Sequence, residues 1–196
     1  SEITFIIVPT PSEAHGGFSL RHVLAAAEDI GPVLAGTQDF HLVVLSSTVM
    51  PGSMEGELLP ALERTSRKRC GADFGLCYSP EFIALGSVIR DLLNPDMVLI
   101  GESDPRSGGL LADLYRGVCE SNPRIQRMNF VNAELTKLAV NTFLTTKISY
   151  ANMLAELCER LPGADVAAVT AAVGSDTRIG GKYLQGALGY GGPCFP

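Results

Sequence analysis

The sequence predicts an α/β protein in which part of a doubly wound parallel sheet is followed by a long central helix and a smaller helical domain. In residues 1–131, short apolar runs alternate with stretches of helical length, an order typical of a parallel sheet with helical crossovers. From residue 132 onward, the apolar residues recur with the period of one long helix. We therefore expect two domains, residues 1–131 and residues 132–196.

Four buried strands and three helices are expected in the first domain. The strands are the apolar runs at residues 3–8, 42–45, 74–78 and 97–100, and the helices are the stretches at 20–34, 54–64 and 105–119. Pro105 stands at the first helical position, which proline favours. Ligands of open α/β sheets bind at the carboxyl ends of the strands, so residues directly after these runs are candidates for a site.

One helix, at residues 132–161, is expected to dominate the second domain. Asn132 is placed to cap its start, and Pro162-Gly163 is expected to end it. Its roughly 30 residues would extend about 45 Å at 1.5 Å per residue. A shorter helix at residues 165–173 and a glycine-rich tail follow.

The tail at residues 186–195 carries the strongest chemical signal. Glycines surround Tyr190 and precede Cys194, which describes a backbone that turns sharply and approaches another group closely. A thiol in such a loop is a candidate nucleophile, because the thiolate is intrinsically reactive. Considered alone, the loop is equally compatible with a glycine-rich turn whose small cysteine is buried.

Composition narrows the classes of partner. The 15 basic and 21 acidic residues give a net charge of −6, which argues against nucleic acid or an anionic membrane as a partner. The five cysteines show no C-x-x-C pair, as expected of a reduced, cytoplasmic protein. The three histidines are early and unclustered, so we expect no metal site.

A complete dinucleotide-binding sheet would show a G-x-G-x-x-G turn after its first strand and an acidic residue about 20 residues further on. The sequence has neither feature. We therefore expect only the second half of a doubly wound domain here, within a longer polypeptide.

Seven motifs occur in one order along the chain. They are Val8-Pro9-Thr10-Pro11, Ser47-Thr48-Val49, Ser79-Pro80-Glu81-Phe82, Asn94-Pro95-Asp96, the run from Glu134 to Asn141, the run from Gly174 to Gly180, and the run from Gly189 to Phe195. This ordered set resembles the UDP-glucose/GDP-mannose dehydrogenase family. The resemblance implies an NAD-dependent oxidoreductase of polysaccharide biosynthesis, which oxidises the C6 alcohol of a UDP- or GDP-linked sugar to the uronic acid in two steps.

The resemblance also implies a role for each catalytic residue. Cys194 would attack the intermediate aldehyde, giving a thiohemiacetal and then a thioester that water hydrolyses. Lys137 would stabilise the oxyanion at C6, and Asn141, one helical turn later, would hydrogen-bond the same region. Glu81 would serve hydrolysis as general base or by positioning water, and Thr48 would hold that water or contact the nicotinamide.

The binding residues follow in the same way. The cofactor NAD is expected to contact Val8, Pro9, Thr10, Ser47 and Thr48. The expected contacts of the nucleotide sugar are Glu81, Phe82, Ile83, Ala84, Leu85, Lys137, Asn141, Arg178, Tyr183, Tyr190 and Gly191. Arg178 would reach the substrate of a neighbouring subunit, since the family forms a homodimer through the helix at 132–161. Leu85 stands where the family often has a second glutamate, which leaves N-acetylated sugars open beside UDP-glucose.

Two other functions remain open at this point. One is a single-step NAD dehydrogenase of the hydroxyisobutyrate or phosphogluconate type, which also has a lysine and an asparagine on a long helix but needs no cysteine. The segment Gly191-Gly192-Pro193-Cys194 argues against that type. The other is a non-catalytic module that binds a nucleotide sugar or mediates oligomerisation.

Overall fold

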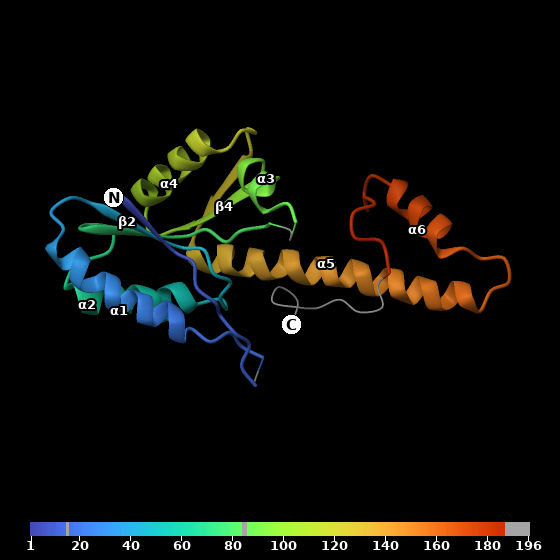
Figure 1. Ribbon diagram of the computed structural model, residues 1–196, viewed down its shortest axis with the longest axis horizontal. Coiled ribbons are helices and arrows are strands. Elements are labelled where there is room, and N and C mark those ends of the chain that lie inside the picture. The colour runs from blue at the N-terminus through green and yellow to red at the C-terminus, as the bar shows by residue number, and fades with distance from the viewer. Residues whose placement is uncertain (15, 84–85, 187–196) are drawn as a thin grey trace. The chain divides into compact units, whose positions relative to one another are not determined.

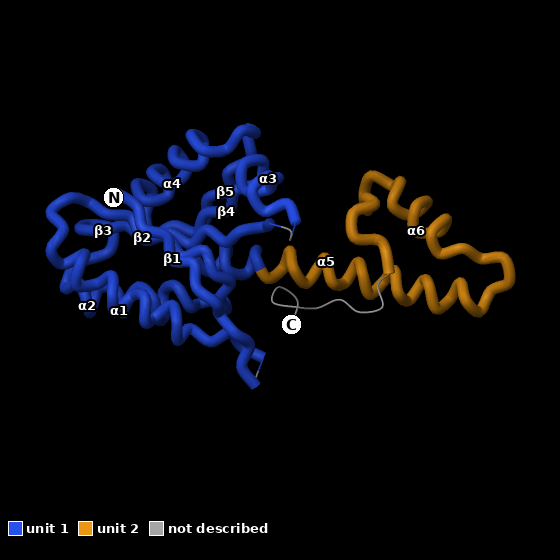
Figure 2. Tube along the Cα trace, in the orientation of Figure 1, with its two compact units in different colours: residues 1–137 blue, residues 138–196 orange. Residues whose placement is uncertain are grey.

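The computed structural model describes residues 1–14, 16–83 and 86–186 of the chain (Figure 1). The chain divides into two compact units, Ser1–Lys137 and Leu138–Pro196 (Figure 2). The boundary between them falls inside the longest helix, so that helix contributes to both units.

Unit 1 is built on a five-stranded sheet with the order β1-β2-β3-β4-β5. The strands are β1 (Ile3–Ile6), β2 (His41–Leu45), β3 (Phe74–Tyr78), β4 (Met97–Glu102) and β5 (Arg124–Met128). Three of the four junctions are parallel, with Val44 opposite Phe5 on one side and opposite Cys77 on the other. The predicted α/β class, with a mostly parallel sheet and a long helix, is confirmed.

The junction of β3 with β4 is antiparallel, through the pairs Cys77–Glu102 and Tyr78–Gly101. The expectation of a wholly parallel sheet is therefore wrong at this junction. A parallel connection needs a crossover that packs back onto the sheet. The helix in this connection, α3 (Val88–Leu93), has no buried residue, so it does not cover the sheet and β4 runs in the opposite direction.

Helices cover both faces of the sheet. The core on one face contains residues of α1 (Arg21–Gly36), of the π-helical turn η1 (Met54–Leu58) and of α2 (Leu59–Ser66), which continues from η1. The core on the other face is formed by β-strand residues and α4 (Pro105–Val118). Figure 1 shows α4 and the pair α1–α2 on opposite sides of the strands.

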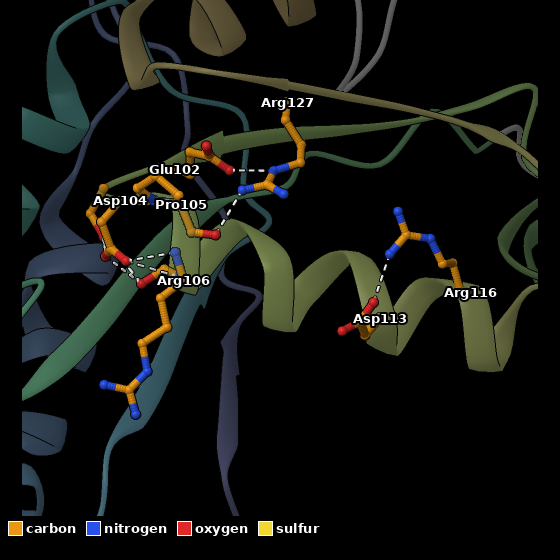
Figure 3. Close-up of polar contacts among 9 residues, drawn as sticks. Glu102, Asp104, Pro105, Arg106, Asp113, Arg116 and Arg127 are labelled. Atoms are coloured by element: carbon orange, nitrogen blue, oxygen red, sulfur yellow. Dashed lines mark hydrogen bonds and ion pairs between the residues drawn. The ribbon is translucent and has the colours of Figure 1, made fainter.

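The start of α4 is fixed by polar contacts on β4 and β5 (Figure 3). The Asp104 carboxylate accepts hydrogen bonds of 3.0 Å from the backbone N–H groups of Arg106 and Ser107. Partial burial opposes ionisation of Asp104, but the hydrogen bonds from Ser107 and its neighbours outweigh it and lower the pKa of the carboxyl group. Arg127 donates to Glu102 and to the Pro105 carbonyl, each at 2.7 Å.

The long helix, α5, runs from Phe130 to Glu159. Asn132 was expected to cap this helix, and that expectation is wrong by three residues. The side chain of Asn129 accepts a hydrogen bond from the backbone N–H of Asn132 at 3.1 Å, so Asn129 caps the helix. In unit 2, α6 (Val166–Ser175) is capped by Asp165. No helix among the described residues is long and apolar enough to cross a membrane.

Candidate active site

The carboxyl ends of β1 and β2 are joined by side-chain hydrogen bonds. The Ser47 hydroxyl donates to the Val8 carbonyl at 2.6 Å and accepts from the Val8 N–H at 3.0 Å. The Thr10 hydroxyl donates to the Thr48 carbonyl at 2.7 Å. The structure thus brings four of the residues expected to contact the cofactor into one connected group, with Pro9 exposed between Val8 and Thr10.

The side chains at the ends of β1 and β2 have a chemical character that suits one part of NAD. They are small and uncharged: valine, proline, serine and threonine. Such residues fit a nicotinamide ring and its ribose hydroxyls, whereas a diphosphate is held by glycine-rich turns, helix N-termini or cations. The strand ends of β1 and β2 therefore fit the nicotinamide end of the cofactor.

Lys137 lies in the second turn of α5, and its side chain is largely buried, with 8% of the residue exposed. Its ammonium donates to the main-chain carbonyl of Glu81 at 2.5 Å and lies 4.5 Å from the centre of the Phe82 ring. A buried ammonium needs such partners, because leaving it without them is costly. The contacts hold the positive charge of Lys137 beside the segment that follows β3.

The partner of Lys137 is the backbone of Glu81, not its carboxylate. Glu81, Phe82 and Ile83 are all half-buried directly after the buried pair Ser79-Pro80. The Ser79 hydroxyl lies 3.0 Å from the Tyr115 hydroxyl of α4, which fixes the end of β3. The backbone is therefore held in place directly before Glu81, Phe82 and Ile83, three of the residues expected to contact the substrate.

Asn141 follows Lys137 by one turn of α5 and is half-buried. Side chains four residues apart emerge from the same face of a helix. That both residues address one ligand group stays a prediction from the sequence.

Glu134 is a residue of this region that the sequence analysis did not single out. It is completely buried, and its two carboxylate oxygens accept from the backbone N–H groups of Gly52 at 2.6 Å and Met54 at 2.8 Å. A glutamate on the apolar side of a helix is rarely buried without such partners. Its place in the helix, three residues before Lys137, is the signal that would have found it.

Tyr78, the last residue of β3, is also fully buried near this carboxylate. Burial raises the pKa of Tyr78; the Val49 backbone opposes this effect and Glu134 adds to it. The phenol is therefore neutral at ordinary pH, and it packs between the segment after β2 and the start of α5 without adding a charge.

Unit 2 presents the remaining described candidates. The Arg178 guanidinium donates to Asp176 at 2.6 and 3.0 Å, and 86% of its side chain is exposed. This pairing raises the pKa of Arg178 and lowers the pKa of Asp176. Tyr183 is exposed and has a positive φ of 65°. The other candidates, Ala84, Leu85, Tyr190, Gly191 and Cys194, lie outside the described residues.

A cavity in unit 1 is lined by residues of η1 and α2, the end of β4 and the start of α5. Three of its side chains are carboxylates, which would repel the diphosphate of a nucleotide, so the cavity does not suit that ligand. The lining residues are Glu55, Leu59, Glu63, Cys70, Glu102, Ser103, Asn129 and Phe130.

Known proteins share both the sequence and the fold. UDP-glucose 6-dehydrogenase AglM of Haloferax volcanii is 38% identical over 198 residues, an alignment that covers 100% of this chain and 46% of that protein. A UDP-glucose dehydrogenase structure from Pyrobaculum islandicum matches with a TM-score of 0.91 and 40% identity, over 100% of this chain and 44% of its own. A GDP-mannose dehydrogenase structure from Pseudomonas aeruginosa matches with a TM-score of 0.84 and 32% identity, over 90% and 39%.

The chain therefore spans less than half the length of these relatives. Family models match it in two consecutive parts: residues 1–119 match the NAD-binding domain of UDP-glucose/GDP-mannose dehydrogenases, and residues 131–196 match their central domain. Because these two matches take up most of the sequence in the order of the family, the chain belongs to the UDP-glucose/GDP-mannose dehydrogenase family.

Proposed function

We propose that this chain is part of an NAD-dependent dehydrogenase that oxidises the C6 alcohol of a UDP- or GDP-linked sugar to the uronic acid. The observation that carries the proposal is the buried ammonium of Lys137, held by the Glu81 carbonyl and the Phe82 ring. Its family and the uncharged strand ends of β1 and β2 support NAD as the cofactor.

In the first oxidation, Lys137 would stabilise negative charge on the C6 oxygen. The chemistry that NAD would supply when bound is acceptance of the hydride from C6. As the C6 hydroxyl loses its proton to solvent and the hydride begins to leave, negative charge develops on the C6 oxygen, and a fixed cation near that oxygen would lower the energy of the transition state. A lysine already held in place by Glu81 and Phe82 loses little orientational freedom at that moment. Asn141 would donate a hydrogen bond to the same oxygen.

The second oxidation would use Cys194, whose role is inferred from its sequence motif. Its thiolate would add to the aldehyde carbonyl, and the adduct would become a thioester when its hydride is transferred to a second NAD. Water then attacks the thioester carbonyl, which releases the free thiol and the carboxylic acid. Glu81 would take the proton of this water, and Thr48 would hold the water in place.

We further propose that two copies of the protein associate through α5. The residues Phe143, Tyr150 and Leu157 recur every seven positions and are 64%, 44% and 49% exposed. Apolar side chains at this spacing lie along one face of a helix, the pattern by which two helices pack together. A second α5, with the same face, would cover them, and the neighbouring copy would supply Arg178.

The function can be tested with the complete polypeptide that carries this chain. Incubation with NAD and UDP-glucose, GDP-mannose or UDP-N-acetylmannosamine should give two NADH and one uronic acid per sugar consumed. Lys137→Met should reduce kcat by about 100-fold or more, as expected when a stabilising charge is removed. Lys68→Met is the matched control, because the Lys68 ammonium also donates to a main-chain carbonyl, that of Thr37, outside the proposed site.

Each result has a defined meaning. Release of the aldehyde with one NADH per sugar would show a single-step dehydrogenase. No NADH with any of the three nucleotide sugars would refute the proposed function. Equal losses in Lys137→Met and Lys68→Met would show that Lys137 acts on stability alone.

A further inference from the structure

We infer that Glu134 is a positioning residue. It sets where residues 46–53, here called the Thr48 segment, lie relative to Lys137. The inference rests on the proposed function for its catalytic consequence, but the contact itself is independent of it. Glu134 joins two parts of unit 1 that are far apart in sequence: the start of α5 and the segment between β2 and η1.

The two hydrogen bonds of Glu134 are accepted from the backbone N–H groups at the start of a helical turn. The N–H groups of Gly52 and Met54 stand at the start of η1, and the first N–H groups of a helix have no acceptor within it. Each takes one oxygen of the same carboxylate, at 2.6 and 2.8 Å. Gly52 has a φ of 94°, a left-handed conformation that glycine adopts without strain. The turn thus directs both N–H groups toward Glu134.

Glu134 and Lys137 together place one side of α5 against two segments. Residues three apart on a helix are neighbours on its surface. Glu134 holds the segment after β2, and Lys137 donates to the Glu81 carbonyl in the segment after β3. The distance between the segment after β2 and the segment after β3 is therefore set by consecutive turns of α5.

The helix that carries both residues is itself immobilised at its start. Phe130 is 2% exposed and Ala133 is completely buried. A Cβ atom added to Gly101 of β4 would come within 2.9 Å of the Ala133 side chain, so strand and helix already touch. Because α5 cannot shift toward the sheet, the length of the Glu134 side chain fixes how far the Thr48 segment lies from α5.

The other end of the Thr48 segment has its own support. The Thr10 hydroxyl donates to the Thr48 carbonyl, and Ser47 is bonded to Val8. Loss of the Glu134 contact should therefore release residues 50–54 and shift Thr48 without unfolding the sheet. Glutamine at position 134 would offer one acceptor oxygen and turn an N–H₂ group toward a backbone donor, so it should break one of the two hydrogen bonds.

The test compares Glu134→Gln with Leu111→Ala in the complete polypeptide. Leu111 is fully buried in the core on the other face of the sheet, so its truncation lowers stability without touching the Thr48 segment. Glu134→Gln should reduce kcat by about 10- to 100-fold, the scale of a small misplacement of reacting groups, with little change in the KM of the nucleotide sugar. Leu111→Ala should retain kcat at a similar loss of Tm.

Amide hydrogen exchange supplies a readout that does not depend on catalysis. In Glu134→Gln the amides of Gly52, Ser53 and Met54 should exchange at least tenfold faster, while those of β2 and β3 remain protected. Glu134→Asp, which keeps both oxygens but is shorter by one methylene, should show a smaller change in both measurements. It also serves as the test variant if Glu134→Gln does not fold.

Several outcomes would overturn the inference. These are unchanged exchange at Gly52, Ser53 and Met54, or a loss of kcat in Glu134→Gln no greater than in Leu111→Ala at equal Tm. If the wild-type protein oxidises no nucleotide sugar, the proposed function fails. The exchange measurement then still decides whether Glu134 holds the segment that contains Thr48.

Discussion

The ammonium of Lys137 lies 4.5 Å from the centre of the Phe82 ring, across two segments of unit 1. Such a cation–π contact is worth about 0.5–2 kcal/mol, depending on how well it is shielded from water. The same ammonium also donates to the carbonyl of Glu81. Glu81 and Phe82, which are adjacent in the chain, therefore both help to orient the ammonium, and the aromatic ring can be removed without removing the hydrogen bond.

We predict that Phe82→Leu lowers kcat/KM by about 2- to 30-fold, the change that a loss of about 0.5–2 kcal/mol would produce. The leucine keeps an apolar side chain but not the electron-rich face that holds Lys137. Phe82→Tyr retains the ring and should stay within about twofold of the wild type. Steady-state kinetics of the three proteins would decide, and equal rates in Phe82→Leu and the wild type would contradict the role of the ring.

The two proposed half-reactions should respond to different substitutions. Cys194→Ala removes the nucleophile, so it should abolish formation of the acid and permit at most slow chemistry at the level of the aldehyde. Glu81→Gln keeps the backbone carbonyl that Lys137 contacts but removes the proposed base, so a thioester should accumulate. Intact-protein mass spectrometry would detect that adduct. Acid formation at the wild-type rate in Cys194→Ala would disprove the covalent mechanism.

The parts of the fold that the sequence predicted best are its buried strands. The expected strand at residues 74–78 coincides with β3, all of whose residues are buried. β5 was missed because its residues are exposed or half-buried at the edge of the sheet, so it lacks an apolar run. The direction of β4 was also unpredictable, because it depends on whether α3 packs on the sheet, a tertiary property with no local signal.

The site shows the same limit. The motif that contains Lys137 predicted an ammonium in the site, but not that its partner would be the Glu81 carbonyl, because that contact depends on the path of the backbone after β3. Glu134 begins one of the seven motifs but was given no role, because a glutamate on a helix is usually solvated. Its partners are N–H groups, which carry no residue-type signal in the sequence.

Two adjacent glycines of α4 should respond in opposite ways to alanine. A Cβ on Gly109 would meet nothing within 4 Å, whereas a Cβ on Gly108 would lie 1.5 Å from a carboxylate oxygen of Glu102. Gly109→Ala should stabilise the protein by about 0.5–1 kcal/mol, the helical preference for alanine. Gly108→Ala should lose that gain, because Glu102 must move away from Arg127, its partner in Figure 3. Thermal unfolding of both variants would test this, and equal Tm values would refute it.

The exposed face of α5 provides a test of the proposed dimer. Phe143→Glu places a charge at the most exposed residue of the apolar stripe, where burial against a second helix would be costly. We expect this variant to be monomeric by light scattering at concentrations where the wild type is dimeric. Val118→Glu, at an apolar and 46% exposed position on α4, should leave the mass unchanged. A wild-type protein that is monomeric and fully active would exclude the dimer.

Arg178 gives the prediction that links the dimer to the substrate. Its guanidinium is held by Asp176 while most of its side chain faces solvent, an arrangement that leaves donors for a sugar or phosphate oxygen. Arg178→Ala should therefore raise the KM of the nucleotide sugar by about tenfold, with no change in Tm, since an exposed ion pair adds little stability. Arg160→Ala is the control, because Arg160 makes a comparable exposed pair with Glu156. If the site takes Arg178 from the neighbouring copy, mixing Arg178→Ala with Lys137→Met subunits should restore the wild-type KM in the hybrid dimer, because one of its two sites then has both residues intact. A hybrid that keeps the raised KM of Arg178→Ala would show that Arg178 serves the site of its own chain.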